Sequence, residues 1–345
     1  MPTEPTPQPA APKKPRKNAR RTGTVALLGR PNVGKSTLLN ALLGERIAIT
    51  SNQPQTTRDR IAGILTTDEG QLVFQDTPGV HTARSRLGKR MNDLADSTAA
   101  SADVVLFVVE VGGSLAPATR EQDRAVLKTV PEGKKIILVV NKVDRLKEKP
   151  QLMEHLAAWA AERDFTALIP LSAKKRDGLK QLTKVLFEHM PVGEPLYPED
   201  ELSDRPVRFF VSELVREQIL LRTREEVPHG VAVTVDAYEE PAGGNAGKKK
   251  SVTRITLTIH VAKDSHKGII IGQGGKMLQA IGTSARERAE RLIGAPIHLD
   301  VKVRATPDWF DDAARLADLG YGDEGKDEKR RPKVASKKKA AAKKR

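Results

Sequence analysis

The sequence predicts an α/β protein with two domains: a mixed, mostly parallel sheet covered by helices on both faces, followed by a smaller α+β domain. In residues 24–190, apolar runs of strand length alternate with amphipathic helical stretches, which is typical of a parallel sheet buried on both sides. Residues 191–206 contain four prolines and several acids, which indicates a linker. Beyond them, strands alternate in polarity and a glycine-rich loop separates helical stretches. We therefore place the first domain in residues 22–190 and the second in residues 207–321.

The first domain opens with a short apolar run that predicts a strand, and similar runs recur along it. Strands are expected at residues 24–29, 61–67, 71–77, 103–111, 134–140 and 165–172. The second and third of these strands are expected to pair with each other. The spacing of apolar side chains predicts helices in this domain, at residues 34–43, 87–100, 120–130, 151–163 and 179–190.

The second domain has a different order of elements. A helix is expected at residues 207–227, followed by alternating strands at 231–238 and 252–263 with a flexible loop between them. An apolar helical stretch then leads into the glycine loop, which precedes a helix at 277–293 and a strand at 297–303. The predicted order is therefore helix, strand, strand, helix, glycine loop, helix, strand.

The composition excludes several classes of protein. The 345 residues include no cysteine, which excludes a disulfide scaffold, a thiolate zinc site and a cysteine nucleophile. The longest apolar run, residues 104–111, is far too short to span a bilayer. The N-terminus lacks the apolar core of a secretory signal. We therefore expect a soluble, cytoplasmic protein.

The net charge of +15 is concentrated at the two ends of the chain. Residues 1–21 carry +5 and residues 322–345 carry +7, so the body between them carries only +3. Both tails are rich in Lys or Arg and lack apolar periodicity, and we expect them to be disordered. Such tails also attract nucleic-acid phosphates or anionic lipid surfaces, and both interpretations remain open at this point.

The segment GRPNVGKS, residues 29–36, matches the phosphate-binding pattern G-x-x-x-x-G-K-[ST]. It follows a predicted strand and opens a predicted helix, so its backbone N–H groups and the helix N-terminus would face nucleotide phosphates. Lys35 is expected to bridge the β- and γ-phosphates, and the Ser36 hydroxyl to bind Mg²⁺. The residues assigned to nucleotide binding here are Gly29, Arg30, Pro31, Asn32, Val33, Gly34, Lys35, Ser36 and Thr37.

The sequence DTPG closes the strand expected at residues 71–77. Taken alone it reads as a turn. At the carboxyl end of a strand above the phosphate loop, however, Asp76 is placed to be a second Mg²⁺ partner. The N–H of Gly79 could reach the γ-phosphate. We assign this stretch to the nucleotide site as Asp76, Thr77, Pro78, Gly79 and Val80.

Two further motifs, NKVD and SAK, each follow an apolar strand and predict guanine recognition. The Asp144 carboxylate can accept hydrogen bonds from guanine N1–H and N2–H₂, a donor pair that adenine lacks. Lys142 can lie against the base, Asn141 can tie its loop to the phosphate loop, and the small residues of SAK allow a backbone N–H to approach guanine O6. The base-binding residues are therefore predicted to be Asn141, Lys142, Val143, Asp144, Ser172, Ala173 and Lys174.

Together these four motifs resemble those of the Ras-like GTPase superfamily, and GRPNVGKS with the later QTTRD, residues 55–59, resembles the bacterial Era group. The resemblance implies binding of GTP and GDP, hydrolysis of GTP to GDP and phosphate, and Mg²⁺ as a cofactor. It also implies switch segments at residues 53–60 and 76–88, the first with a Thr that ligates Mg²⁺ when GTP is bound. We assign Thr57 to this role, although spacing alone does not decide between it and Thr56. The expected Mg²⁺ ligands are Ser36, Thr57 and Asp76.

One departure from Ras concerns the attacking water. Ras carries a Gln after its D-T-x-G motif, whereas this chain has Val80, which cannot hydrogen-bond a water. In GTPases similar to this one, an Asn at the position of Asn32 holds a K⁺ ion in place of an arginine finger, and a turn residue is the equally supported alternative. The residues expected to act in catalysis are Asn32, Lys35, Thr57 and Gly79.

The glycine loop of the second domain has the sequence GQGG, residues 272–275. With its surrounding element order it resembles a KH domain of the second type, in which such a loop clamps about four single-stranded nucleotides. Residues 248–304 carry a net charge of +8 and no aromatic side chain, so contacts would depend on the RNA backbone rather than on stacking. The predicted RNA-binding residues are Lys267, Gly272, Gln273, Gly274, Gly275 and Lys276.

The resemblance to the Era group extends over about residues 24–321, through the motif PDWF at 307–310. It implies a nucleotide-switched monomer that binds the 3′ end of 16S ribosomal RNA and acts in assembly of the 30S subunit. It also implies peripheral association with the cytoplasmic side of the inner membrane. The alternatives are a constitutive RNA-binding protein with a structural GTP, and a peripheral membrane GTPase anchored by its basic tails.

Overall fold

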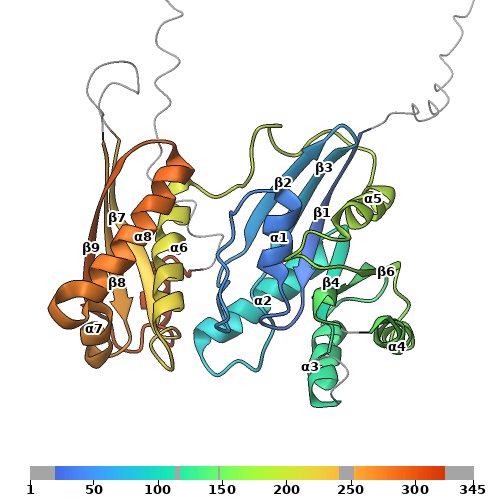
Figure 1. The fold of residues 1–345 in the computed structure, drawn as a ribbon, viewed down its shortest axis with the longest axis horizontal. Helices are drawn as coiled ribbons and strands as arrows, with labels where there is room; N and C mark the ends of the chain where they lie inside the picture. Colours follow the sequence, from blue (N-terminus) through green and yellow to red (C-terminus); the bar gives the residue numbers. More distant parts are fainter. Residues whose placement is uncertain (1–19, 113–116, 147, 241–251, 323–345) are drawn as a thin grey trace, which may run out of the picture.

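A computed structural model describes residues 20–112, 117–146, 148–240 and 252–322 of the chain. The basic tails and the loop expected between the alternating strands fall almost entirely outside these residues, so the expected disorder of the tails and the flexibility of that loop stay predictions. Figure 1 shows two bodies side by side, each built around its own sheet.

The N-terminal sheet has the strand order β2-β3-β1-β4-β5-β6. The strand β2 pairs antiparallel with β3, and the other neighbours pair parallel. This confirms a mixed, mostly parallel sheet and the expected pairing of its second and third strands. The strands are β1 (Arg21–Leu28), β2 (Ile61–Thr67), β3 (Gly70–Asp76), β4 (Val104–Glu110), β5 (Lys135–Asn141) and β6 (Ala167–Pro170).

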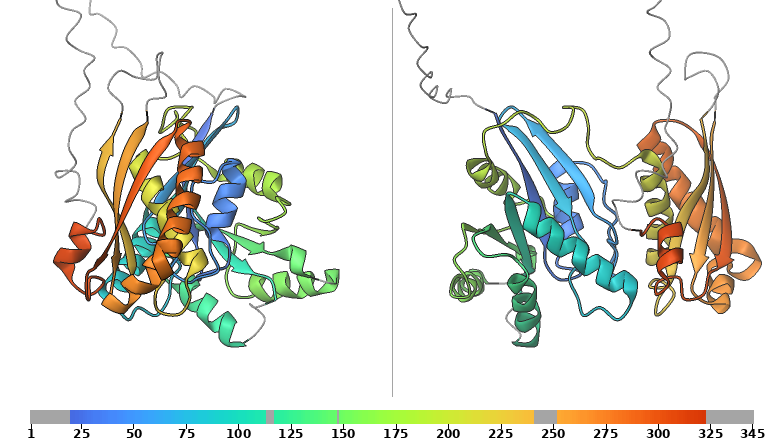
Figure 2. Two further views of the ribbon diagram at one scale, coloured as in Figure 1. Left: turned by 60° about the vertical axis from the view of Figure 1, so that its left-hand side comes forward. Right: turned by 180° about the vertical axis from the view of Figure 1, so that it is seen from behind.

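Helices cover both faces of this sheet (Figures 1 and 2). Along β4, the side chains of Val104, Leu106 and Val108 join a hydrophobic cluster on one face, and those of Val105, Phe107 and Val109 join a cluster on the other. Helices α1 and α5 pack into the first cluster, and α2, α3 and α4 into the second. The helices are α1 (Lys35–Leu43), α2 (Arg86–Ser101), α3 (Pro117–Lys128), α4 (Lys149–Ala160) and α5 (Leu179–His189).

The C-terminal sheet has the order β7-β8-β9, with β7 antiparallel and β9 parallel to β8. Side chains of α6 and α8 pack on it and form a core that includes the buried residues Val215, Leu257 and Ile281. The element order matches the prediction. Its members are α6 (Val207–Arg222), β7 (Val231–Glu239), β8 (Thr253–Val261), α7 (Asp264–Ile271), the 3₁₀ turn η3 (Gln273–Gly275), α8 (Lys276–Ile293), β9 (Ile297–Ala305) and α9 (Ala313–Asp318).

The helix expected at residues 207–227 is shorter than predicted, because α6 ends at Arg222. The hydroxyl of Thr223 donates back to the carbonyl of Ile219 at 2.8 Å, and Glu225 takes a left-handed φ of 59°, so the chain turns before Pro228. Helix α9 was not predicted; the side chain of Asp312 caps it. Within the described part of the chain, every helix is too short or too polar to cross a bilayer.

The proline-rich segment 191–206 is bonded to the N-terminal sheet along its length: its first residues bond to the start of β1, its middle to Gln71 of β3, and its last part lies along the edge strand β2. The N–H of Ile64 donates to the carbonyl of Leu202 at 3.0 Å, and the Ser203 hydroxyl donates to the carbonyl of Ala62 at 2.6 Å. The guanidinium of Arg205 donates to the carbonyl of Arg60. A movement of the C-terminal domain therefore has to bend the chain beyond these bonds or break them.

Candidate nucleotide site and RNA-binding loop

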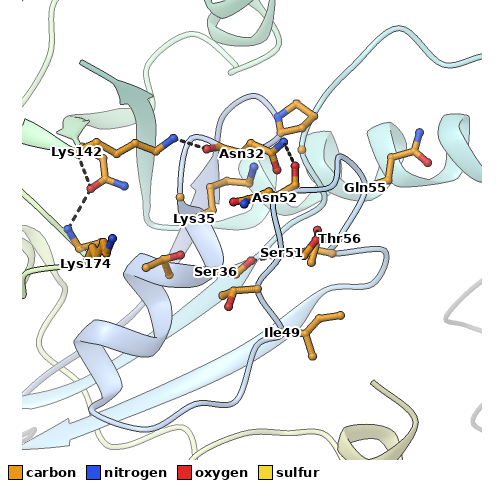
Figure 3. A pocket seen from close by; sticks show the side chains of 18 of the residues that line it. Asn32, Lys35, Ser36, Ile49, Ser51, Asn52, Gln55, Thr56, Lys142 and Lys174 are labelled. Carbon is orange, nitrogen blue, oxygen red and sulfur yellow. Dashed lines mark hydrogen bonds between the residues drawn. The ribbon is translucent and has the colours of Figure 1, made fainter. Parts of the chain in front are cut away.

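A cavity of about 610 Å³ lies at the carboxyl ends of the N-terminal strands, and all four predicted motifs contribute to its lining (Figure 3). Helix α6 of the C-terminal body also reaches it, through Leu221. The predicted residues that line it are Pro31, Asn32, Gly34, Lys35, Ser36, Thr37, Thr57, Gly79, Asn141, Lys142, Asp144, Ala173 and Lys174. The other predicted residues are not part of this lining: Gly29, Arg30, Val33, Asp76, Thr77, Pro78, Val80, Val143 and Ser172.

The phosphate loop contains two glycines that have no room for a side chain. At Gly29, which has a φ of 153°, a Cβ would lie 2.3 Å from the carbonyl oxygen of Val108. At Gly34, which has a φ of 104°, a Cβ would lie 2.4 Å from Nδ2 of Asn141. The loop therefore takes this path only with glycine at both positions.

Lys35 is buried, and its Nζ donates to the carbonyl oxygens of Gly29 at 2.9 Å and Arg30 at 3.0 Å. Burial lowers the pKa of Lys35 to about 8, although the carboxylate of Asp76 opposes the shift. A nearby anion would favour the charged form of this amine. The position of Lys35 therefore suits an amine that binds a nucleotide phosphate.

Three hydroxyl and carboxyl groups meet at the start of α1. The Ser36 hydroxyl donates to Oδ2 of Asp76 at 2.7 Å, and Oγ1 of Thr57 lies 2.9 Å from Oγ of Ser36 and 3.3 Å from the same carboxylate oxygen. The other oxygen of Asp76, Oδ1, is buried and has no hydrogen-bond partner among the described residues. This set of hard oxygen donors with one unsatisfied carboxylate oxygen fits Mg²⁺.

The two adjacent threonines of the first predicted switch segment differ in what they contact. Thr57 reaches Ser36 and Asp76, as described above. The Thr56 hydroxyl instead donates to the carbonyl of Gln53 at 2.6 Å and lies 2.6 Å from the Ser51 hydroxyl, within its own loop. The geometry therefore favours Thr57 over Thr56 as the Mg²⁺ ligand.

Asn141 connects three of the motifs. Its Nδ2 donates to the carbonyl of Val33 at 2.9 Å, and its Oδ1 accepts from the N–H groups of Lys142 at 2.8 Å and Ala173 at 3.1 Å. Asp144 is exposed, and its Oδ1 accepts a 2.5 Å hydrogen bond from the Ser172 hydroxyl. That bond lowers the pKa of Asp144, so the carboxylate is ionised at neutral pH.

Asn32 and Val80 are the two residues whose predicted roles concern the attacking water. Asn32 has a left-handed φ of 64°, and its Nδ2 donates to the carbonyl of Asn52 at 3.0 Å (Figure 3). Val80 packs against the apolar cluster beneath α2 and presents no polar group. At Gly79 a Cβ would lie 2.6 Å from the backbone nitrogen of Pro31, so this glycine brings the second switch segment into contact with the phosphate loop.

Several buried charged residues near the site were missed in the sequence. Arg58, Arg216 and Glu217 are at most 2% exposed. Arg58 and Arg216 join the first predicted switch segment to the C-terminal domain, and Glu217 joins Thr50, just before that segment. The available signal was weak: the charged pair at 216–217 follows an apolar stretch of a helix that carries other charged residues as well. Behind the phosphate loop, Nε of Arg30 donates to the buried Oδ1 of Asp123 at 2.6 Å.

The GQGG loop lies between α7 and α8. Gly272, Gly274 and Gly275 have φ values of 70°, 58° and 79°, and a Cβ on Gly274 or Gly275 would meet no described atom within 4 Å. The loop is therefore open to a ligand. A hollow of about 380 Å³ begins at Gly275 and continues between α8 and β9. Its lining includes residues that were not predicted, namely Leu278, Gln279, Gly282, Thr283, Arg286, Leu299 and Val301.

The comparisons with known proteins match both halves of the chain. A family model described as a 50S ribosome-binding GTPase matches residues 24–142, and a KH-domain model matches residues 226–310. The GTPase Era of Geobacter sp. strain M21 is 44% identical over 303 residues, covering 87% of this chain and 98% of that protein. The GTPase Era of Nostoc sp. strain PCC 7120 is 44% identical over 302 residues, covering 87% of this chain and 90% of that protein.

Two solved structures resemble both domains together, each at 35% sequence identity and each covering 88% of this chain and 99% of its own. A Tyr-to-Ala variant of Aquifex aeolicus Era bound to GDP and AlF₄⁻ superimposes with a TM-score of 0.81. Era in complex with MgGDPNP and nucleotides 1506–1542 of 16S ribosomal RNA superimposes with a TM-score of 0.80.

Proposed function

This chain belongs to the Era family of GTPases, and on that premise we propose that it is a nucleotide-controlled protein that binds the 3′ end of 16S ribosomal RNA. Residues 22–190 would form the GTPase domain and residues 207–321 the RNA-binding domain. The observation that carries the proposal is the convergence of four motifs on one cavity, while the glycine loop lies on a second domain that contacts the switch segments. Action in assembly of the 30S subunit follows from the RNA partner.

The nucleotide roles are distributed along the cavity. We propose that the phosphate-loop backbone and Lys35 bind the phosphates, that Asp144 accepts from the guanine edge, and that Lys142 lies against the base. Mg²⁺, held by Ser36, Thr57 and Asp76, would neutralise charge on the β- and γ-phosphates. Oδ1 of Asp76 has no hydrogen-bond partner among the described residues, and this supports the assignment. The Gly79 N–H would donate to the γ-phosphate.

The residue that orients the attacking water differs from that of Ras, because Val80 has no polar group. We propose that Asn32 takes part by holding a K⁺ ion near the phosphates. The side-chain amide nitrogen of Asn32 is bonded to the Asn52 carbonyl. The ion would therefore be held through the side-chain oxygen of Asn32, Oδ1. The positive charge would then act where an arginine finger acts in other GTPases.

Hydrolysis should be faster in K⁺ than in Na⁺ at matched ionic strength, and Asn32→Ala should erase the difference. Because Asn32 has a φ of 64°, alanine is strained there, whereas Asn32→Gly removes the same side chain without strain and should behave alike. Phosphate release measured in both salts for the three proteins checks this. Equal rates for the unmodified protein would leave Asn32 a turn residue.

For the RNA, we propose that the loop 272–275 clamps the backbone and that Lys267 and Lys276 pair with phosphates. Lys276 is exposed at the start of α8, and the helix N-terminus there favours an anion. The hollow between α8 and β9 would hold the bases. Because the loop lacks aromatic neighbours in residues 248–304, affinity should fall steeply with salt.

RNA should bind more tightly when the protein carries a GTP analogue than when it carries GDP, and by linkage it should raise the affinity for the analogue by the same factor. Couplings of this kind are typically about 1–3 kcal/mol, or roughly 5- to 150-fold. The measurement is a titration with the 16S fragment found in the solved relative, at fixed salt, against protein loaded with GDP or a non-hydrolysable analogue.

Affinities that agree within error in this titration would favour the constitutive RNA-binding alternative with a structural GTP. Peripheral membrane association through the basic tails remains a separate proposal. It is tested by co-sedimentation with anionic vesicles, which removal of the tails should abolish.

A further inference from the structure

We propose that Arg216, on the C-terminal helix α6, is a positioning residue for Thr57, and that it fixes the Thr57 hydroxyl by holding the backbone carbonyl of Thr56. The inference rests on the proposed Mg²⁺-GTP site. It goes beyond that site by assigning part of its geometry to the other domain.

Arg216 is 1% exposed, and its guanidinium is held in place by Glu213 of the same helix. Its Nε and Nη2 donate to the two carboxylate oxygens of Glu213, at 2.7 and 2.6 Å, and Nη2 also donates to the carbonyl of Thr56. A two-point pair of this kind fixes the plane of the guanidinium. The bond to Thr56 therefore comes from a rigid donor rather than from a mobile side chain.

The residue after Thr57 is held as firmly as the one before it. The Arg58 guanidinium is buried in the C-terminal domain, where it donates to the carbonyls of Pro228 at 3.2 Å, His229 at 3.0 Å and Val231. It also lies over the ring of Trp309, with its carbon 5.6 Å from the ring centroid. Thr57 is thus placed between two anchors that both belong to the second domain.

A third contact lies earlier in the same loop, which connects α1 to β2. Glu217, next to Arg216 on α6 and fully buried, accepts from the N–H of Thr50 at 3.0 Å and from Arg46 at 2.8 Å. It also pairs with Arg288 of α8. Helix α6 therefore contacts the loop that carries Thr57 at Thr50 and again at Thr56. It lies on the side of its domain that faces the GTPase domain in Figure 1.

This arrangement differs from simple packing between domains. Apolar side chains would hold two domains together without contacting the backbone beside a metal ligand, whereas Arg216 bonds the carbonyl adjacent to Thr57. A displacement of α6 would therefore move Thr57 away from Ser36 and Asp76. The consequence is that a shift of the RNA-binding domain weakens the triphosphate site without touching the nucleotide.

The experiment compares variants of the full chain by two readouts that do not need turnover. These are the Mg²⁺ concentration for half-maximal binding of a non-hydrolysable GTP analogue, and hydrogen exchange of peptides covering residues 50–58. The test variants are Arg216→Met and the double variant Glu213→Leu with Arg216→Met, in which neither member of the ion pair is left without the other. The matched control is Arg222→Met on the same helix, because Arg222 bonds Gln218 and Ser284 of its own domain.

Loss of a buried, charge-assisted hydrogen bond should raise the Mg²⁺ concentration needed by roughly tenfold or more. Exchange at residues 50–58 should become faster, while affinity for GDP stays within about twofold, because the first switch segment is released in the GDP state. Arg216→Lys should need less Mg²⁺ than Arg216→Met, because a lysine can keep part of the bond to Thr56. Arg222→Met should behave as the unmodified protein. An unchanged Mg²⁺ dependence in both test variants, or an equal loss of GDP and analogue affinity, would overturn the proposal.

Thr57→Ala separates the inference from the function it rests on. A raised Mg²⁺ requirement in Thr57→Ala without one in the Arg216 variants would overturn the positioning role alone. No change in Thr57→Ala would overturn the assignment of Thr57 to the metal site, and the positioning role with it.

Discussion

Replacing Asp144 by Asn should weaken GTP binding by roughly tenfold or more, because a hydrogen bond to a charged group contributes about 1.5–3 kcal/mol. The same change should favour xanthine nucleotides. Oδ1 of Asp144 accepts from Ser172 at 2.5 Å, and an Asn oxygen can keep that bond. The amide nitrogen then takes the place of the second carboxylate oxygen, so it opposes the guanine N2–H₂ and matches the xanthine O2.

The measurement is a pair of titrations with GTP and xanthosine triphosphate. Asp177→Asn is the matched control, since Asp177 is exposed in the neighbouring loop and is not among the residues that line the cavity. Retained preference for guanine in Asp144→Asn would remove Asp144 from the base site. A loss of affinity for both nucleotides in the control would show that the loop, rather than the carboxylate, had been damaged.

The sheet and the nucleotide site were largely predictable because both depend on local sequence signals. The strand β4 is apolar on both of its faces, and this pattern indicates a strand buried between helix layers. The motifs of the site follow such strands directly, and the carboxyl ends of parallel strands lie at one edge. The predicted residues of the four motifs therefore meet around one cavity, although Val80 and others lie outside its lining.

The contacts between the domains were not predictable by the same reasoning. Arg216 contacts a carbonyl 160 residues earlier in the chain, and Arg58 contacts carbonyls about 170 residues later. An arginine in a loop or a helix is usually solvated, and only the fold shows that these two are buried. Helix α6 is buried around most of its circumference because it packs on its own sheet and also faces the GTPase domain.

The interpretation of residues 191–206 shows a similar limit. Prolines indicate that a segment is neither helix nor central strand, and this is compatible both with a free linker and with a chain laid along a sheet edge. The backbone bond from the Ile64 N–H to the Leu202 carbonyl, with the side-chain bond from Ser203 to Ala62, decides for the second arrangement. These bonds depend on which strand lies at the edge of the sheet. The sequence of the segment alone does not reveal that order.

Replacing Gln273 and Gly274 together by Asp should abolish RNA binding and leave GTP binding without RNA intact. Both positions are exposed, and a Cβ at Gly274 would meet no described atom within 4 Å. Gly274 has a φ of 58°, which Asp tolerates better than most residues. Two negative charges at the clamp would repel the phosphates, and their side chains would fill the space that the RNA backbone needs.

The control is the same double replacement by Asn, which has nearly the shape of Asp and the same tolerance of a left-handed backbone but carries no charge. Titration of the 16S fragment at two salt concentrations separates the two causes. If charge repulsion dominates, the Asn variant should retain more affinity than the Asp variant, and the gap should narrow at high salt because the charges are screened. If the side chains block the clamp, both variants should lose binding at either salt. Binding by the Asp variant at the affinity of the unmodified protein would show that RNA is held elsewhere, and the assignment of residues 272–275 would then be wrong.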